Sequence, residues 1–191
     1  GQRDIDGKAI RVLHNLSFVE DPTRVFRAVR FEQRLGFQVG RQTEHLLRSA
    51  IRLGLLEKIS GERIFNELCL ILKERDPHPA VARLAHLDVL GYLHPALTGK
   101  VDYGRFFDEA KRVMDWYDLL YTGRPCRRWL CYFLILTVPL DKTGMEAFCR
   151  RLNVRPRYRE ILVAQRAEAL GVLRRLERRG PGMRPPKASS L

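Results

Sequence analysis

The stretch EDPTRVFRAVRFEQRLG, residues 20–36, predicts the fold most clearly. Asp21 is a good helix N-cap, Pro22 suits the first helical position, and Gly36 is a typical residue after a last helical turn. Apolar side chains recur within it at helical spacing and form one face, made of Val25, Ala28, Val29 and Leu35. The stretch therefore predicts a helix over 21–35 that buries one side.

Helical spacing recurs along the chain, whereas the alternating apolar and polar pattern of a strand is nearly absent. Further helices are predicted at 41–53, from Ser60, at 79–90 with Gly91 as its end, at 105–121, 128–138 and 142–153, and from Pro156 to about Arg179. The connections between them are short. The predicted fold class is all-α, arranged as a helical bundle or array.

The helix that Ser60 caps has the most regular apolar stripe. Its members are Ile64, Phe65, Leu68, Ile71 and Leu72. Arg63 and Glu67 stand four residues apart on the same helix, so we expect them to form an ion pair. Four aromatic residues further along, Trp116, Tyr117, Trp129 and Tyr132, are expected in the core rather than as stacking platforms for bases.

The charge of the chain points to an anionic partner. The 191 residues include 35 Lys and Arg against 22 Asp and Glu, a net charge of +13. Residues 148–191 hold 12 Lys and Arg against 3 Asp and Glu, so most of the surplus lies in the last quarter. Nucleic acid is the leading candidate for the partner.

The cysteines and the termini bound the class of protein further. Four cysteines without CxxC spacing or paired histidines argue against zinc and favour reduced core thiols in a cytoplasmic protein. The apolar run 129–140 is shorter than the roughly 20 residues that span a membrane, so no membrane partner is expected. The chain starts at Gly1 and ends in GPGMRPPKASSL, so we expect a piece of a longer protein.

The arginines of the opening stretch allow two interpretations. Arg24, Arg27, Arg30 and Arg34 fall on one arc of the helix. A capped helix with a solvated basic face is one interpretation. The other is base recognition, because Asp21 only accepts hydrogen bonds and Arg24 only donates them. Such a pair suits the amine and ring nitrogen of cytosine or adenine, while guanine and uracil present a carbonyl instead of the amine.

The longer stretch 4–37, DIDGKAIRVLHNLSFVEDPTRVFRAVRFEQRLGF, resembles the neck of bacterial class II tRNA nucleotidyltransferases and poly(A) polymerases. Glu20, Asp21 and Arg24 match the E-D-x-x-R motif of that family. The resemblance implies that Asp21 and Arg24 pair with the incoming CTP or ATP and that Glu20 orients Arg24. Arg27 follows them on the helix, where it would favour the nucleotide phosphates.

Two further motifs extend the resemblance. SGERIFNEL, residues 60–68, is similar to the next neck motif, in which Glu62 and Arg63 would brace the first helix. Asp4 and Arg11 match the hinge motif that precedes the neck. The resemblance implies a hinge end at 1–12, a neck at 13–76, a helical RNA-binding body at 77–180 and a flexible linker at 181–191. It is strong over 1–100 and looser beyond.

The resemblance also implies a head domain that this stretch does not contain. In the family, the head domain has a Gly-Ser phosphate cradle, followed by an Asp-x-Asp pair that holds two Mg²⁺ ions. Asp4-Ile5-Asp6 lacks such a cradle, so we expect no catalytic residue and no metal site here, and no nucleotide transfer by this segment alone. The head domain, in the same parent chain, would be a partner of this segment.

The basic C-terminal region gives the candidate RNA contacts. They are Arg150, Arg151, Arg155, Arg157, Arg174, Arg175, Arg178 and Arg179. A solvated face is the alternative to phosphate contact with tRNA. Two other functions stay open, a stand-alone RNA-binding module and a helical protein-interaction domain. The resemblance also leaves open whether the parent adds CCA, the final A or a longer tail.

Overall fold

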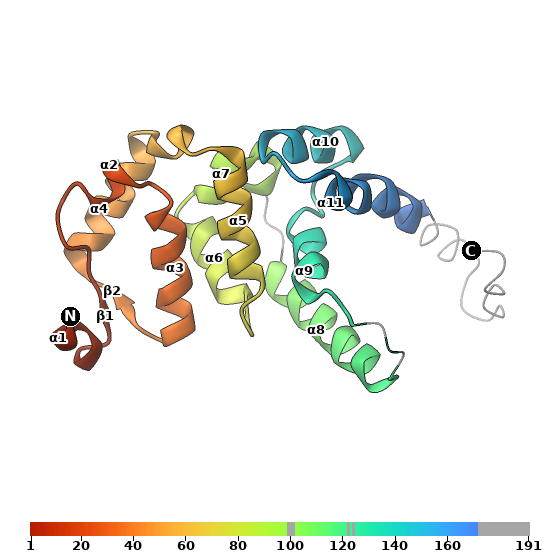
Figure 1. Ribbon diagram of the computed structural model, residues 1–191, viewed down its shortest axis with the longest axis horizontal. Coiled ribbons are helices and arrows are strands. Elements are labelled where there is room, and N and C mark those ends of the chain that lie inside the picture. The colour runs from red at the N-terminus through yellow and green to blue at the C-terminus, as the bar shows by residue number, and fades with distance from the viewer. Residues whose placement is uncertain (99–101, 122, 124, 172–191) are drawn as a thin grey trace.

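The computed structural model describes residues 1–98, 102–121, 123 and 125–171. Figure 1 shows an elongated array of helices, with the N-terminal elements at one end and α10 and α11 at the other. The first half contains α1 (Gln2–Asp6), β1 (Ala9–Ile10), α2 (Ser17–Glu20), α3 (Arg24–Leu35), β2 (Gln38–Val39), α4 (Arg41–Arg52), the short 3₁₀ helix η1 (Leu55–Lys58) and α5 (Gly61–Leu72).

The second half has no strand among its described residues. It contains α6 (His78–His86), α7 (Val89–Leu93), η2 (Pro95–Thr98), α8 (Tyr103–Leu119), α9 (Arg128–Leu136), α10 (Lys142–Arg151), α11 (Pro156–Glu160) and the π-helical turn η3 (Ile161–Gln165). The helix that Pro156 opens continues to Gly171, and the rest of its predicted length lies outside the described residues. The all-α prediction is confirmed.

Two strands were not expected from the sequence. β1 and β2 pair in parallel, with Ala9 opposite Gln38 and Ile10 opposite Val39. Each strand has two residues, which is too short to produce the alternating pattern by which a strand is recognised. This small ladder joins the chain before α2 to the end of α3.

Helix α3 begins at Arg24 rather than at Asp21. Asp21 is extended and a turn at Pro22 and Thr23 separates it from the helix, although its carboxylate still accepts the Thr23 backbone N–H. Gly36 ends the helix with a left-handed φ of 62°, as expected. Leu35 is half exposed instead of buried, since α3 ends at the surface at this point.

The predicted helix 79–90 is two helices. The chain turns at Asp88, whose φ of 60° is left-handed, so α6 ends at His86 and α7 begins at Val89. A short polar side chain tolerates this conformation better than most residues. Gly91, expected as a helix end, lies inside α7 against Thr98, where a Cβ atom would come within 2.4 Å of the threonine methyl.

The core is one continuous apolar cluster in which α5 is central. All five residues of its predicted stripe are buried. Phe65 lies edge-on to Trp129 and to Phe133, so α5 connects the α3 side of the molecule to α9. Tyr132 is buried and stacks on Phe107, as expected of a core residue, but Trp116 is 59% exposed and the prediction for it was wrong. It lies on the solvent side of α8.

All four cysteines are free thiols. Burial raises the pKa of Cys69 to about 12 and those of Cys131 and Cys149 to about 11. The thiolate is the reactive form of cysteine, so these three side chains are inert at neutral pH. Among the described residues, no helix has the length and apolar character needed to cross a membrane.

Candidate functional site

Glu20, Asp21 and Arg24 come together at the junction of α2 and α3. Arg24 donates from Nη1 to the backbone oxygen of Ser17, at 3.1 Å, and the same nitrogen lies 3.6 Å from a Glu20 carboxylate oxygen. Ser17 is buried in α2, so its carbonyl gives the guanidinium a fixed anchor. Glu20 and Arg24 are 52% and 39% exposed, which leaves the other guanidinium nitrogens accessible to a ligand.

All the hydrogen bonds that fix the Asp21 side chain reach the same one of its two carboxylate oxygens. Its Oδ1 accepts from the Thr23 backbone N–H at 3.1 Å, from the Thr23 hydroxyl at 2.6 Å and from Arg63 Nη2 at 2.8 Å. No described residue donates a hydrogen bond to Oδ2. Partial burial opposes ionisation, but the bonds from Thr23 and the charge of Arg63 outweigh it and hold the Asp21 pKa below its ordinary value. Asp21 is therefore a fixed, charged acceptor.

Arg63 connects the second motif to the first. It projects from the first turn of α5 to Asp21 and also donates to the Thr23 hydroxyl at 3.3 Å. The predicted ion pair between Arg63 and Glu67 is absent, because Arg63 pairs with an acid 42 residues away instead. Glu62, its neighbour, lies 3.8 Å from Arg155 and so contacts the C-terminal half.

The arginine arc of α3 divides into two parts. Arg30 and Arg34 lie 4.0 and 3.8 Å from a Glu74 oxygen, so this carboxylate partly neutralises them. Arg27 is exposed and has no ion pair among the described residues. Glu67 faces this arc from α5, and burial raises its pKa despite the nearby charges of Arg30 and Arg27. The net positive end of α3 is thus the end that carries Arg24 and Arg27.

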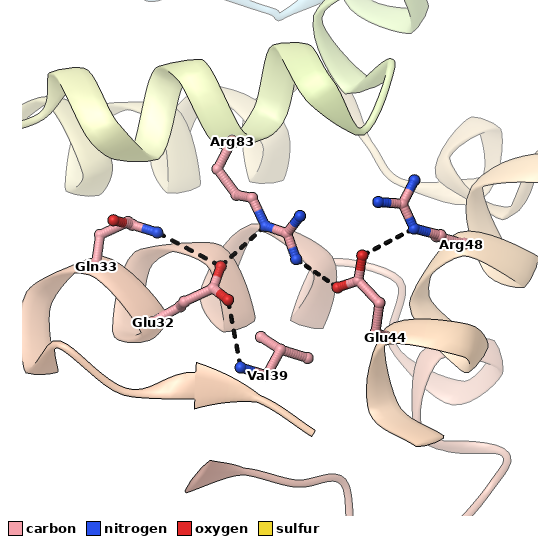
Figure 2. Close-up of polar contacts among 6 residues, drawn as sticks. All are labelled: Glu32, Gln33, Val39, Glu44, Arg48 and Arg83. Carbon is pink, nitrogen blue, oxygen red and sulfur yellow. Dashed lines mark hydrogen bonds and ion pairs between the residues drawn. The ribbon is translucent and has the colours of Figure 1, made fainter. Parts of the chain in front are cut away.

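A network of ion pairs joins α3 to the neighbouring helices α4 and α6. Arg83 of α6 donates from Nε to Glu32 of α3, at 3.0 Å, and from Nη2 to Glu44 of α4 (Figure 2). The other Glu32 oxygen accepts the Val39 backbone N–H, which ties in β2. Arg48 binds the second oxygen of Glu44 at 2.8 Å. This network fixes α3, the helix that presents Arg24, against α4 and α6.

The hinge residues are also paired. Arg11 donates to Asp4 at 3.1 Å, so the two predicted hinge residues contact each other. His14 lies 3.4 Å from Glu20, which places this histidine beside the candidate site. Within the described ranges, no three His, Cys, Asp or Glu side chains are close enough together to hold a metal ion.

The predicted RNA-contacting arginines have different surroundings. Arg150 is exposed, Arg155 faces Glu62, and Arg157 donates to the Tyr158 hydroxyl at 2.8 Å. Arg151 donates to the Leu93 carbonyl at 2.8 Å and lies over the Tyr92 ring, so it joins α10 to α7. The remaining four, Arg174, Arg175, Arg178 and Arg179, lie outside the described residues.

Sequence reasoning missed the residues that position the site. Thr23 fixes Asp21 through two hydrogen bonds, and the spacing of an Asp two residues before a Thr is a known signal for such a local contact. Ser17 contributes through its backbone carbonyl, which any residue could supply. The side chain at that position therefore gives no signal in the sequence.

Comparisons with known proteins show which enzymes the chain resembles. Residues 36–101 match a protein family described as the probable RNA and SrmB-binding site of polymerase A. The chain is 49% identical to the A-adding tRNA nucleotidyltransferase of Geobacter sulfurreducens over 177 residues, which are 93% of this chain and 20% of that protein. It is 33% identical to the enzyme of the same name from Aquifex aeolicus, over 80% of this chain and 19% of that one.

A solved structure gives the same result. A tRNA nucleotidyltransferase in complex with a primer tRNA and an incoming ATP analogue matches with a TM-score of 0.77 and 31% identity, over 95% of this chain and 53% of that one. The all-α fold and these matches make the chain similar to one segment of the tRNA nucleotidyltransferases. It belongs to the tRNA nucleotidyltransferase and poly(A) polymerase family and corresponds to the neck and body region. The chain spans about one fifth of the two curated relatives.

Proposed function

We propose that this chain is the part of a tRNA nucleotidyltransferase that reads the base of the incoming nucleotide and holds the RNA. The observation that carries the proposal is the separate anchoring of Asp21 and Arg24. Asp21 keeps one carboxylate oxygen free, and Arg24 keeps accessible donors while Ser17 and Glu20 fix its position. Asp21, just before α3, and Arg24, at the start of α3, form a rigid acceptor and donor pair.

The pair suits the Watson–Crick edges of adenine and cytosine. Asp21 Oδ2 would accept a proton of the exocyclic amine, and Arg24 would donate to the neighbouring ring nitrogen. Guanine and uracil would place a carbonyl oxygen against the Asp21 carboxylate, which leaves two acceptors facing each other. Arg27, exposed one turn along α3, would face the phosphates. CTP and ATP are therefore the proposed substrates.

The parent protein would supply the chemistry from a head domain in the same chain. That domain would bind the Mg²⁺ ions that activate the RNA 3′-hydroxyl, so the segment 1–191 alone should transfer no nucleotide. The neck would comprise residues 13–76 and the body residues 77–180. Because the two relatives that match over 80% and 93% of the chain are A-adding enzymes, addition of A is the favoured activity. The cytoplasm is the proposed location, since the cysteines are free thiols.

The basic C-terminal helices would hold the RNA backbone. Arg150, Arg155 and Arg157 are exposed on α10 and α11, and they can reach phosphates without disturbing the core. Contacts of this kind position RNA without reading its sequence. We expect the affinity for tRNA to fall by about one order of magnitude or more between about 50 and 200 mM salt. A flat salt dependence would contradict phosphate contact.

A chimera tests the base-reading role. The matching segment of the Geobacter sulfurreducens enzyme is replaced by this chain, and addition of A to tRNA is measured. Arg24→Ala should reduce addition by about a hundredfold or more, because it removes charged hydrogen bonds to the base. Arg34→Ala, on the same helix but beside Glu74, is the matched control and should leave addition unchanged. Equal rates for Arg24→Ala and the parent chimera would overturn the proposal.

A further inference from the structure

Helix α4 carries a basic stripe that the base-reading site does not use. Arg41, His45, Arg48 and Arg52 are spaced by four, three and four residues, so they share one face of this helix. Arg41 and Arg52 are exposed and have no ion pair among the described residues. In Figure 1, α4 lies toward the N-terminal end of the molecule, away from α10 and α11.

The stripe borders a hollow of about 410 Å³ between α4 and the turn that joins α6 to α7. His45, Arg48, Arg52 and Ile51 line it from α4, and Leu87 and Asp88 line it from the turn. The left-handed conformation of Asp88 sets the geometry of the turn that forms the opposite wall. A hollow of this size can hold a nucleotide unit, with apolar lining from Ile51 and Leu87 and basic groups from α4.

The guanidinium groups of the hollow have N–H donors that no hydrogen bond among the described residues uses. Arg48 uses Nε for Glu44, and its two terminal nitrogens point away from that carboxylate (Figure 2). Arg52 uses one nitrogen for the hydroxyl of Ser49. Glu44 is shared with Arg83, so it does not neutralise Arg48 fully. Asp88 is the single acid that lines the hollow, against two arginines.

We infer that the hollow beside α4 binds a phosphodiester group of the RNA, as a second contact distinct from the C-terminal arginines. This rests on the proposed RNA-holding role. Arg48 and Arg52 donate to the phosphate oxygens, and the imidazole of His45 adds a donor at the rim. The region 36–101, which matches the RNA-binding family description, contains every residue of this hollow.

Two charge changes of opposite sign test the site in the 191-residue chain. Arg52→Glu places an acid in the hollow, while Asp88→Asn removes one and keeps a residue that tolerates the left-handed conformation. Arg48 is left intact because it also binds Glu44, so its substitution would change more than the hollow. Arg112→Glu, exposed on α8, is the matched control for the charge reversal. Binding of fluorescently labelled tRNA is measured by anisotropy across a salt series.

The site predicts opposite effects for the two substitutions. Arg52→Glu should weaken tRNA binding about tenfold at low salt and reduce the slope of log K against log salt by about one. Asp88→Asn should strengthen binding about twofold to threefold, and Arg112→Glu should change it less than about twofold. Circular dichroism of each variant is the control for an intact helical fold.

The outcomes separate this inference from the proposed function. If Arg52→Glu binds tRNA with wild-type affinity while Arg155→Glu/Arg157→Glu loses affinity, the hollow is not an RNA site. The proposed C-terminal RNA contact would then still hold. Absence of tRNA binding by the wild-type chain would overturn both. ATP binding is measured in parallel, and a loss of ATP binding with unchanged tRNA binding in Arg52→Glu would assign the hollow to a free nucleotide and contradict the inference.

Discussion

Arg83 is the residue whose removal should destabilise the fold most through charge alone. Its guanidinium donates to Glu32 and Glu44, and it is only 21% exposed (Figure 2). Arg83→Met keeps much of the apolar stem and removes both hydrogen bonds. The two carboxylates then remain half-buried without this partner, which is the costly part of the change.

The size of the effect follows from the two bonds. A hydrogen bond to a charged group contributes about 1.5–3 kcal/mol, and partial exposure to water lowers the sum. We expect Arg83→Met to reduce the free energy of unfolding by about 2–4 kcal/mol. For a chain of this length, that corresponds to a fall in Tm of roughly 4–16 °C.

Thermal and urea unfolding followed at 222 nm measure this loss. Arg48→Met is the matched control, because Arg48 binds the same Glu44 but is 42% exposed. An exposed pair one helical turn apart contributes about 0–1 kcal/mol, so this control should be nearly neutral. If Arg83→Met were no more destabilising than Arg48→Met, burial of the network would not be what makes it stabilising.

Two further predictions concern α5. Burial raises the Glu67 pKa, so its contribution to stability is fully present below the ordinary value and is lost as pH rises through the folded-state value. Glu67→Gln should therefore raise Tm relative to wild type at about pH 8 but not at about pH 4, and an equal difference at both pH values would refute this. At Gly61, a Cβ atom would lie 1.9 Å from the Arg151 backbone oxygen. Gly61→Ala should cost about 1–3 kcal/mol in urea unfolding, whereas Gly171→Ala, with open space around it, should be neutral or stabilising; similar effects would contradict the close contact.

The sequence predicted those elements whose signal is local and repeated. The stripe of α5 is buried over five positions because an amphipathic helix of this length can bury only one face. The end of α3 at Gly36 was predictable for a similar reason, since glycine favours the left-handed residue after a helix. Glu20, Asp21 and Arg24 lie together at the junction of α2 and α3, and their role in base reading stays a prediction.

The elements that were missed depend on contacts far apart in the chain. Arg63 had a helical neighbour of opposite charge, Glu67, but Asp21 offers it a carboxylate already oriented by Thr23. The break at Asp88 replaces a continuous helix because the turn lets α7 pack Gly91 against Thr98. Helical periodicity in the sequence predicts neither the ion-pair partner of Arg63 nor the helix break at Asp88.

Base selection by the chimeric enzyme, in competition between ATP and GTP, tests whether Asp21 reads the base. Asp21→Asn removes the carboxylate that faces the exocyclic amine of adenine and repels the carbonyl of guanine. This substitution should lower the preference for ATP over GTP by at least about tenfold, while the Arg34→Ala chimera should keep it. An unchanged preference in Asp21→Asn, at a measurable rate of addition, would contradict the claim that Asp21 reads the base.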